Sequence, residues 1–238
     1  MSNFHRNSVM RPAGSVALQK IVRPDPSLSV VPARELTLRE IMHYGFPNAK
    51  QSDEVNRWRL ENCRNLWRGM RTVILARMLN IPHFYGKLSL AAIWGNGRVT
   101  DYGLASLRVV TTAGVGFIVD AFQNSVELEI MKFHGIGTGN TAEASGDTAL
   151  VTELTTEYNP NSTRATGSLT EGASANIFRT VGTNTLDSGT PAVVEHGIFS
   201  AASSGVLLDR SIFSAINLVG ANGDGLQSTY DLTLAAGS

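Results

Sequence analysis

The sequence predicts a mainly β protein with an N-terminal helical segment: an antiparallel β-sandwich, jelly-roll or immunoglobulin-like, preceded by an extended arm and one long helix. Beyond residue 85, short apolar segments alternate with turns rich in Gly, Asn and Ser, which is typical of sandwiches. Residues 52–79 instead repeat their apolar side chains with a helical period. We therefore expect an extended arm over 1–35, a helical docking segment over 36–84 and a β-sandwich domain over 85–238.

The composition excludes several classes of protein. Of the 238 residues, 42% are hydrophobic, 17% are charged and 23 are glycine, which excludes a long coiled coil, a collagen and a highly charged disordered chain. The one cysteine, Cys63, excludes an internal disulfide and a cysteine-rich zinc site. The longest nearly apolar window, residues 114–119, is far too short to span a bilayer, and no signal peptide is visible. We therefore expect no membrane contact.

Charge is divided unevenly along the chain, although its formal sum is zero. Residues 1–80 hold 13 Lys and Arg against 6 Asp and Glu, a net of +7, and residues 81–238 hold 7 against 14, a net of −7. Such a division indicates two surfaces with different partners, or self-association through opposite charges. Chance segregation of charge is the alternative.

Residues 1–35 are expected to form an extended arm. The prolines of this segment are Pro12, Pro24, Pro26 and Pro32. Because proline fixes φ and removes a hydrogen-bond donor, this spacing leaves no room for a regular helix. The segment has the composition of a flexible tail, but it holds enough Val, Leu and Ile to be ordered along a neighbouring subunit.

Two helices are expected in the next segment. Thr37 and Glu40 have the spacing of a capping box, which predicts a short helix over 37–44. The second helix, over 52–79, begins at the N-cap residue Ser52 and ends before Pro82. Its apolar stripe consists of Val55, Trp58, Cys63, Leu66, Trp67, Met70, Val73 and Ile74. The thiol on this stripe is expected to be buried as a small hydrophobic group.

The period changes to that of β-strands near residue 85. Alternation predicts strands at 88–92 and 104–110, joined by a turn with a favoured Asn-Gly pair at 94–97. Residues 113–122 are predicted to form a short buried helix, whose inward side chains would be Val115, Ile118, Val119 and Phe122. The remaining predicted strands are 130–136, 150–157, 164–171, 176–186, 191–200, 206–217 and 226–234.

Signatures of enzymes are not found in the sequence. The glycine-rich segment 135–139 lacks the spacing of a dinucleotide-binding loop and has no following Gly-Lys-Ser/Thr, so a structural turn is expected. None of the five histidines lies within four residues of another, and Glu195 and His196 face opposite sides of a predicted strand. We expect no catalytic, cofactor or metal site, although distant residues could still assemble one.

Arginine is concentrated in the long predicted helix. The six arginines are Arg57, Arg59, Arg64, Arg68, Arg71 and Arg77. Phosphate binding with base stacking on tryptophan is one interpretation. We prefer docking on an acidic protein surface, because the tryptophans of this helix lie on its apolar stripe. The residues predicted to dock are Arg57, Arg64, Arg68 and Arg71, which lie largely off that stripe.

Several blocks of the C-terminal half resemble structural proteins of tailed-bacteriophage virions. The blocks are FHGIGTG at 133–139, TAEA at 141–144, GDTAL at 146–150, TGS at 166–168, EG at 171–172, VEHGIFSAA at 194–202 and GVLLDRS at 205–211. Capsid-decoration and tail-fibre modules carry similar runs, and the resemblance covers about residues 105–238. It implies a β-rich protein that acts through contact surfaces rather than through a reaction.

The resemblance implies a capsid decoration or cement protein on the outer surface of a phage head. The expected partners are the major capsid protein or other virion proteins, and the chain is expected to form a homo-oligomer, a trimer or dimer. Its location would be the virion, after synthesis in the host cytoplasm. The alternative is a tail or neck component such as a fibre or adaptor protein. A carbohydrate-binding module and an enzyme are further alternatives, and nucleic acid is not an expected partner.

Overall fold

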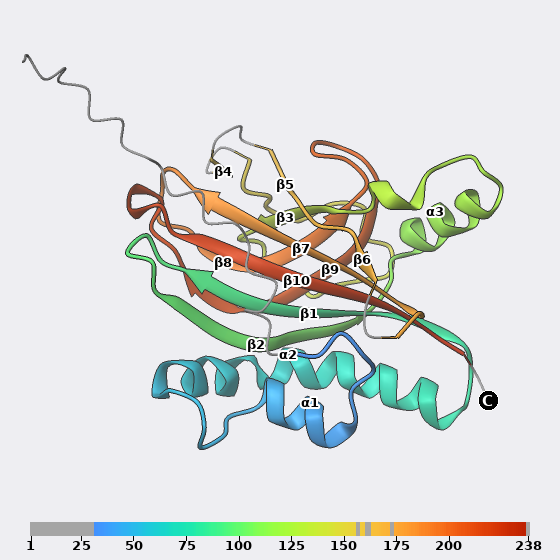
Figure 1. Cartoon of the computed structure of the whole chain (residues 1–238), viewed down its shortest axis with the longest axis horizontal. Helices are drawn as coiled ribbons and strands as arrows, with labels where there is room; N and C mark the ends of the chain where they lie inside the picture. Colours follow the sequence, from blue (N-terminus) through green and yellow to red (C-terminus); the bar gives the residue numbers. More distant parts are fainter. Residues whose placement is uncertain (1–30, 156–157, 160–162, 172–173, 237–238) are drawn as a thin grey trace, which may run out of the picture.

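The computed structural model describes residues 31–155, 158–159, 163–171 and 174–236, and the elements named below belong to those residues (Figure 1). The helices are α1 (Leu38–Gly45), α2 (Asp53–Met78) and α3 (Thr112–Phe122), and the 3-10 turns are η2 (Leu128–Ile130) and η3 (Gly220–Asn222). The strands are β1 (His83–Ile93), β2 (Val99–Val109), β3 (Phe133–Gly137), β4 (Tyr158–Asn159), β5 (Ala165–Thr166), β6 (Thr170–Glu171), β7 (Ile177–Leu186), β8 (Ala192–Phe199), β9 (Leu207–Asn217) and β10 (Gly225–Ala235).

Two antiparallel sheets face each other, which confirms the predicted mainly β, sandwich-like architecture. The large sheet has the strand order β2-β1-β10-β7-β4, with β6 also paired to β7, and the small sheet has the order β5-β3-β8-β9. Apolar side chains of both sheets form one core between them because successive residues of a strand point to opposite faces. This core includes Leu88, Leu90, Leu186 and Leu226 of the large sheet and Ile136, Val193, Phe213 and Ile216 of the small sheet.

The best-predicted strands are those with a sustained alternation of side chains. They are 176–186, 191–200, 206–217 and 226–234, which correspond to β7, β8, β9 and β10. On β10 one set of alternating side chains, including Tyr230 and Leu232, faces the core. However, Gln227, Thr229 and Asp231 on its other side are buried too. The reason is that β10 is a central strand, paired with both β1 and β7, and its other face is also covered.

Two predicted strands are wrong in their extent. Of the described residues in 150–157, only Glu153 makes a bridge, to Gly137. Segment 164–171 contains two separate two-residue strands, β5 and β6, which pair with different sheets. The strand expected at 130–136 begins at residue 133, after η2. In 150–157 and 164–171 the described residues pair with β3 and β7, and these pairings do not follow the alternation of apolar and polar residues.

The helices α1 and α2 lie beside the β2 edge of the large sheet, and α2 also contacts β9 of the small sheet (Figure 1). Thr37 and Glu40 form the predicted capping box of α1. The helix α2 runs without a break over 26 residues, in spite of Gly69. That glycine allows close packing, because a Cβ atom there would lie 1.5 Å from the carbonyl oxygen of Leu107 on β2.

The helix α3 is present where it was predicted, and the predicted inward residue Ile118 is buried, but the other three predicted inward residues are not. Phe117 and Ile118 are buried, whereas Val115, Val119 and Phe122 are exposed. Gly114 decides the rotation, because a Cβ at this position would lie within 3 Å of the Leu208 backbone on β9. The bare Gly114 side therefore meets the sheet, and the opposite apolar side faces outward.

Most of the predicted arm, residues 1–30, lies outside the described residues. The described residues 31–35 pack on the large sheet. Val31 is fully buried, and its carbonyl oxygen accepts a hydrogen bond from Arg179 at 3.1 Å. The ammonium group of Lys87 donates to the carbonyl oxygen of Arg34 at 3.1 Å. The base of the arm is thus attached at β1 and β7.

Candidate functional site

The helix α2 carries the residues predicted to dock, and its ends are set by local chemistry. The Ser52 hydroxyl accepts a hydrogen bond from the Val55 N–H at 3.3 Å, and Asp53 and Glu54 occupy the first turn, where the helix dipole favours negative charge. At the other end Asn80 adopts a positive φ of 55°, which turns the chain out of the helix toward β1.

The inner face of α2 fastens the helix to both sheets. Leu66, Met70 and Val73 pack in an apolar cluster with residues of β1 and β2. Asn62 bridges the sheets: its amide group donates to the carbonyl oxygen of Ala105 at 2.8 Å and its oxygen accepts from the Ser214 N–H at 2.9 Å. These contacts fix the rotation of α2, and so they determine which arginines face outward.

Two of the six arginines serve the fold. Arg59 is 1% exposed and donates to the carbonyl oxygens of Tyr102, His43 and Phe46 at 2.9–3.3 Å. Burial lowers the pKa of its guanidinium group from the usual value. Arg77 donates to the carbonyl oxygen of Leu36 at 3.1 Å. Both side chains therefore hold α2 to the segment around α1 and to β2.

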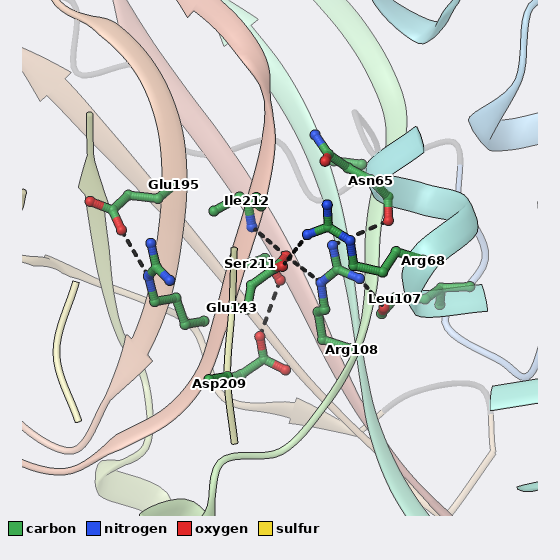
Figure 2. A network of polar contacts seen from close by, with 12 residues as sticks. Asn65, Arg68, Leu107, Arg108, Glu143, Glu195, Asp209, Ser211 and Ile212 are labelled. Carbon is green, nitrogen blue, oxygen red and sulfur yellow. Dashed lines mark hydrogen bonds and ion pairs between the residues drawn. The ribbon is translucent and has the colours of Figure 1, made fainter. Parts of the chain in front are cut away.

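Arg68, one of the four residues predicted to dock, is half-buried and already has an ionic partner. Its guanidinium group lies 3.2 Å from a carboxylate oxygen of Glu143, in the loop that follows β3. Figure 2 shows Glu143 reached by Arg68 from α2 and by Arg108 from β2. Arg68 thus joins the helix to the loop, and it differs from the other three predicted residues.

Arg57, Arg64 and Arg71 are exposed, and none of the three has a hydrogen bond or ion pair with the described residues. Exposed apolar side chains alternate with them at spacings of three and four, which place them on one side of the helix. We define the outer face of α2 as Arg57, Leu60, Arg64, Trp67, Arg71, Leu75 and Met78. Leu60 is 65% exposed and Met78 is 78% exposed. The face is therefore both cationic and apolar.

The prediction that the whole apolar stripe of α2 is buried is wrong at its edge. Trp58 is buried and donates to the carbonyl oxygen of Ser214 at 2.8 Å, but Trp67 is 50% exposed and Cys63 is only half-buried. The predicted stripe covers more of the helix circumference than one sheet can contact. Trp67 consequently belongs to the outer face.

A second set of charged residues lies beneath α2 and was not predicted. We call it the buried network, and its members are Arg108, Glu143, Asp147, Glu195 and Arg210. Besides its two arginine partners, Glu143 accepts a hydrogen bond from the Ile212 N–H on β9 at 3.0 Å. Arg108 also donates to the carbonyl oxygen of Asn65 at 3.1 Å (Figure 2). Glu143, in the loop after β3 of the small sheet, is thereby bonded to Arg108 of β2 in the large sheet and to Arg68 of α2.

Glu195 on β8 is the centre of the other half of the buried network. It is fully buried and accepts N–H groups of Gly139, Val151 and Thr152 at 2.8–3.1 Å. Arg210 on β9 donates to the same carboxylate at 2.9 Å. Two glycines of the segment 135–139 are explained by this contact, because a Cβ at Gly137 or Gly139 would lie 2.5–2.6 Å from a Glu195 oxygen.

Asp209 adjoins the network and is an unusual carboxyl group. Ser211 donates to one of its oxygens at 3.1 Å and Tyr230 to the other at 3.4 Å. Burial raises the pKa of Asp209 to about 7, against the opposing effect of the Ser211 hydrogen bond. Burial likewise raises the pKa of Tyr230 well above its usual value.

Two histidines distant in sequence meet between the sheets. His134 Nδ1 lies 3.0 Å from His196 Nε2, and His134 Nε2 lies 3.0 Å from the Thr180 hydroxyl. Burial lowers the pKa of His134 to about 3 and lowers that of His196 well below its usual value. As predicted, Glu195 and His196 point to opposite sides of β8, so they make no acid–base pair.

Three charged residues of the resembling sequence blocks are bonded together through Arg210. Glu195 pairs with Arg210, and Asp147 lies 3.1 Å from the same guanidinium group. These side chains hold strands and loops in place and leave little free capacity for a ligand. Within the described ranges, no three His, Cys, Asp or Glu side chains are grouped to hold a metal ion. No helix among the described residues is long and apolar enough to cross a membrane.

Comparisons with known proteins give no relative for this chain. No protein-family model matches the sequence, and a search of curated proteins gives no significant match. The candidate functional site is the outer face of α2, which is identified from the sequence pattern and from its exposure in the structure.

Proposed function

We propose that this chain is a non-enzymatic structural protein of a tailed-phage virion, a decoration or cement protein that binds the outer surface of the head. The observation that carries the proposal is the outer face of α2, where exposed arginines with no partner among the described residues alternate with exposed apolar side chains. Guanidinium groups form bidentate hydrogen bonds with carboxylates, and apolar side chains add the burial that stabilises a contact. Such a face suits an acidic protein surface.

The buried network supports the same proposal from another side. The blocks that resemble virion proteins supply Asp147 and Glu195, which both contact Arg210 inside the fold, and Glu143, which pairs with Arg108 of β2. In this interpretation the blocks maintain a rigid β-sandwich, and contact with partners is left to α2. The finer assignment of a jelly-roll or immunoglobulin-like strand order is part of this proposal.

The test is incorporation into virions. Arg57→Gln, Arg64→Gln and Arg71→Gln together should reduce the amount of chain in purified particles, and added salt should weaken docking of the wild-type chain. Arg68 is left unchanged because it binds Glu143 within the chain. Arg39→Gln with Lys50→Gln serves as the control, since both residues are exposed and lie off α2.

Quantitative mass spectrometry of the particles measures the outcome. Copy numbers near that of the major capsid protein support a decoration protein, and a handful of copies supports the tail or neck alternative. Equal incorporation of the triple variant and the control would contradict docking through α2. A gel shift at low salt tests the nucleic-acid alternative. If the free wild-type chain retains DNA and the triple variant does not, the outer face of α2 binds nucleic acid rather than protein.

A further inference from the structure

A second exposed surface of the protein has the opposite charge to the outer face of α2. Residues 112–131 hold Asp120, Glu127 and Glu129 and no Lys, Arg or His. All three carboxylates are exposed, and they lie among exposed apolar side chains of α3 and of η2, which contacts α3. We define the α3–η2 surface as Val115, Val119, Asp120, Phe122, Glu127, Leu128 and Glu129.

The apolar part of this surface is large and regularly spaced. Val115, Val119 and Phe122 follow one another at intervals of four and three residues on α3, and Phe122 is 82% exposed. This interval places the three side chains in one row, as in the seam of a helix pair. On α2 the same intervals of three and four connect Arg57 through Met78.

An open cavity extends the apolar area beside α3. It has a volume of about 500 Å³ and is lined mainly by apolar side chains. They include Ile118, Leu128, Met131, Leu169, Phe178 and Leu232. The Glu129 side chain lines the same cavity, so a carboxylate stands beside the apolar opening. Trp67 lies between Arg64 and Arg71 on α2. Its ring suits the apolar cavity, and the neighbouring arginines suit the Glu129 carboxylate at the opening.

From this complementarity we propose that the outer face of α2 binds the α3–η2 surface of a second copy of this chain. Arg57, Arg64 and Arg71 face Asp120, Glu127 and Glu129 of the neighbour, and the apolar side chains of both surfaces are buried between the copies. The inference rests on the docking role of α2 in the proposed function and names a neighbouring copy of the chain, rather than the major capsid protein, as the partner of this face. It accounts for the +7 and −7 division of charge as a means of self-association.

The two surfaces cannot be joined within one chain. In Figure 1, α2 lies below the sheets, whereas α3 lies at their upper right. The contact is therefore head-to-tail between copies. A head-to-tail contact produces a closed ring, of which a trimer is the smallest example, or an open filament, and it does not produce a two-fold symmetric dimer.

Charge reversal tests the contact directly. Variant P carries Arg57→Glu, Arg64→Glu and Arg71→Glu, and variant Q carries Asp120→Lys, Glu127→Lys and Glu129→Lys. Sedimentation of the full chain over a concentration series should show self-association of the wild type and an association at least about tenfold weaker for P and for Q alone. An equimolar mixture of P and Q should associate again, because each altered surface then meets its complement. The control Arg39→Glu with Lys50→Glu should associate as the wild type does.

Each other outcome overturns the inference. A wild type that stays monomeric, a variant P that associates normally, or a mixture that fails while P and Q are both folded would each do so. Loss of association on deletion of residues 1–30 would identify the arm as the occupant instead. Failure in these measurements leaves virion incorporation to be judged by its own experiment, so a failed self-contact and a failed virion role are told apart.

Discussion

The buried network and the outer face of α2 use arginine in opposite ways. Around Glu143 and Glu195 the guanidinium groups have carboxylate or carbonyl partners inside the protein, and those of Arg108 and Arg210 are buried. On α2 three guanidinium groups extend into water without any such partner among the described residues. The difference teaches that position in the fold, and not the number of arginines, separates residues that stabilise the chain from residues available to a partner.

The largest effect is expected where a buried ion pair is broken. Glu195→Gln removes the buried charge that Arg210 and three backbone N–H groups share, although Arg210 keeps Asp147, and it should lower the free energy of unfolding by about 3–5 kcal/mol. Glu54→Gln is the control, because its pair with Arg98 at 3.1 Å is exposed and should contribute only about 0–1 kcal/mol. Urea unfolding of the two variants measures both values. Similar losses of unfolding free energy in the two variants would mean that Glu195 does not hold the loops around Gly139 and Val151 in place.

Two arginines in the same turn of α2 give the sharpest internal comparison. Arg59→Gln should cost about 2–3 kcal/mol, because three carbonyl oxygens lose a charged donor. Arg57→Gln should change the free energy of unfolding by less than about 0.5 kcal/mol, as is usual for exposed positions. Thermal and urea unfolding of the two single variants decide the matter. Equal costs would remove the distinction between the inner and outer faces.

Asp209 predicts a pH dependence with a definite sign. Its folded pKa of about 7 exceeds the ordinary value of 3.8, so between those pH values the folded protein keeps a proton that the unfolded chain releases. The stability from this group is present below about pH 4 and is lost as the pH rises through 7. Relative to the wild type, Asp209→Asn should gain about 2 kcal/mol between pH 5 and pH 8.

The histidine pair acts in the opposite direction. Because the folded pKa values of His134 and His196 are lowered, their contribution is present above about pH 6.5 and is lost in acid. Both histidines are unchanged in Asp209→Asn, so they cancel in the comparison with the wild type. Parallel stability curves of the two proteins from pH 5 to pH 8 would show that Asp209 titrates normally.

The smallest effect is expected at the thiol. Since Cys63 is half-buried rather than buried, Cys63→Ser should cost less than about 1 kcal/mol, below the 1–3 kcal/mol of a buried polar group without a partner. A thiol reagent should label native Cys63 more slowly than the unfolded chain but to completion. A native protein that resists labelling altogether would place Cys63 in the core.

Local sequence patterns were sufficient to predict the elements that have capping residues, a following proline or a regular alternation of side chains. Ser52 and Pro82 define α2, Thr37 and Glu40 define the start of α1, and regular alternation defines β7 to β10. Periodicity failed in α3, because a helix that is apolar on nearly all sides has no single inward face. Only the contact of Gly114 with Leu208, 94 positions further along the chain, decides its rotation.

The candidate site was predictable in part. Arg57, Arg64 and Arg71 were identified by their place off the apolar stripe, but the same argument included Arg68, whose partner Glu143 is remote in sequence. The buried network had no local signal, because its carboxylates and arginines come from separate strands and loops. The N–H groups of Val151 and Thr152 bind Glu195, which is why the strand expected at 150–157 does not form.

The claim that α2 acts through its outer face is tested most directly by oxidative footprinting of intact virions and of the free chain at low concentration. Hydroxyl radicals oxidise exposed tryptophan and methionine, and the outer face holds Trp67 and Met78. We predict strong protection of both in virions, with no change at Trp94, whose indole donates to Thr100 within the chain at 2.8 Å. Equal oxidation of Trp67 and Met78 in the two states would contradict the account.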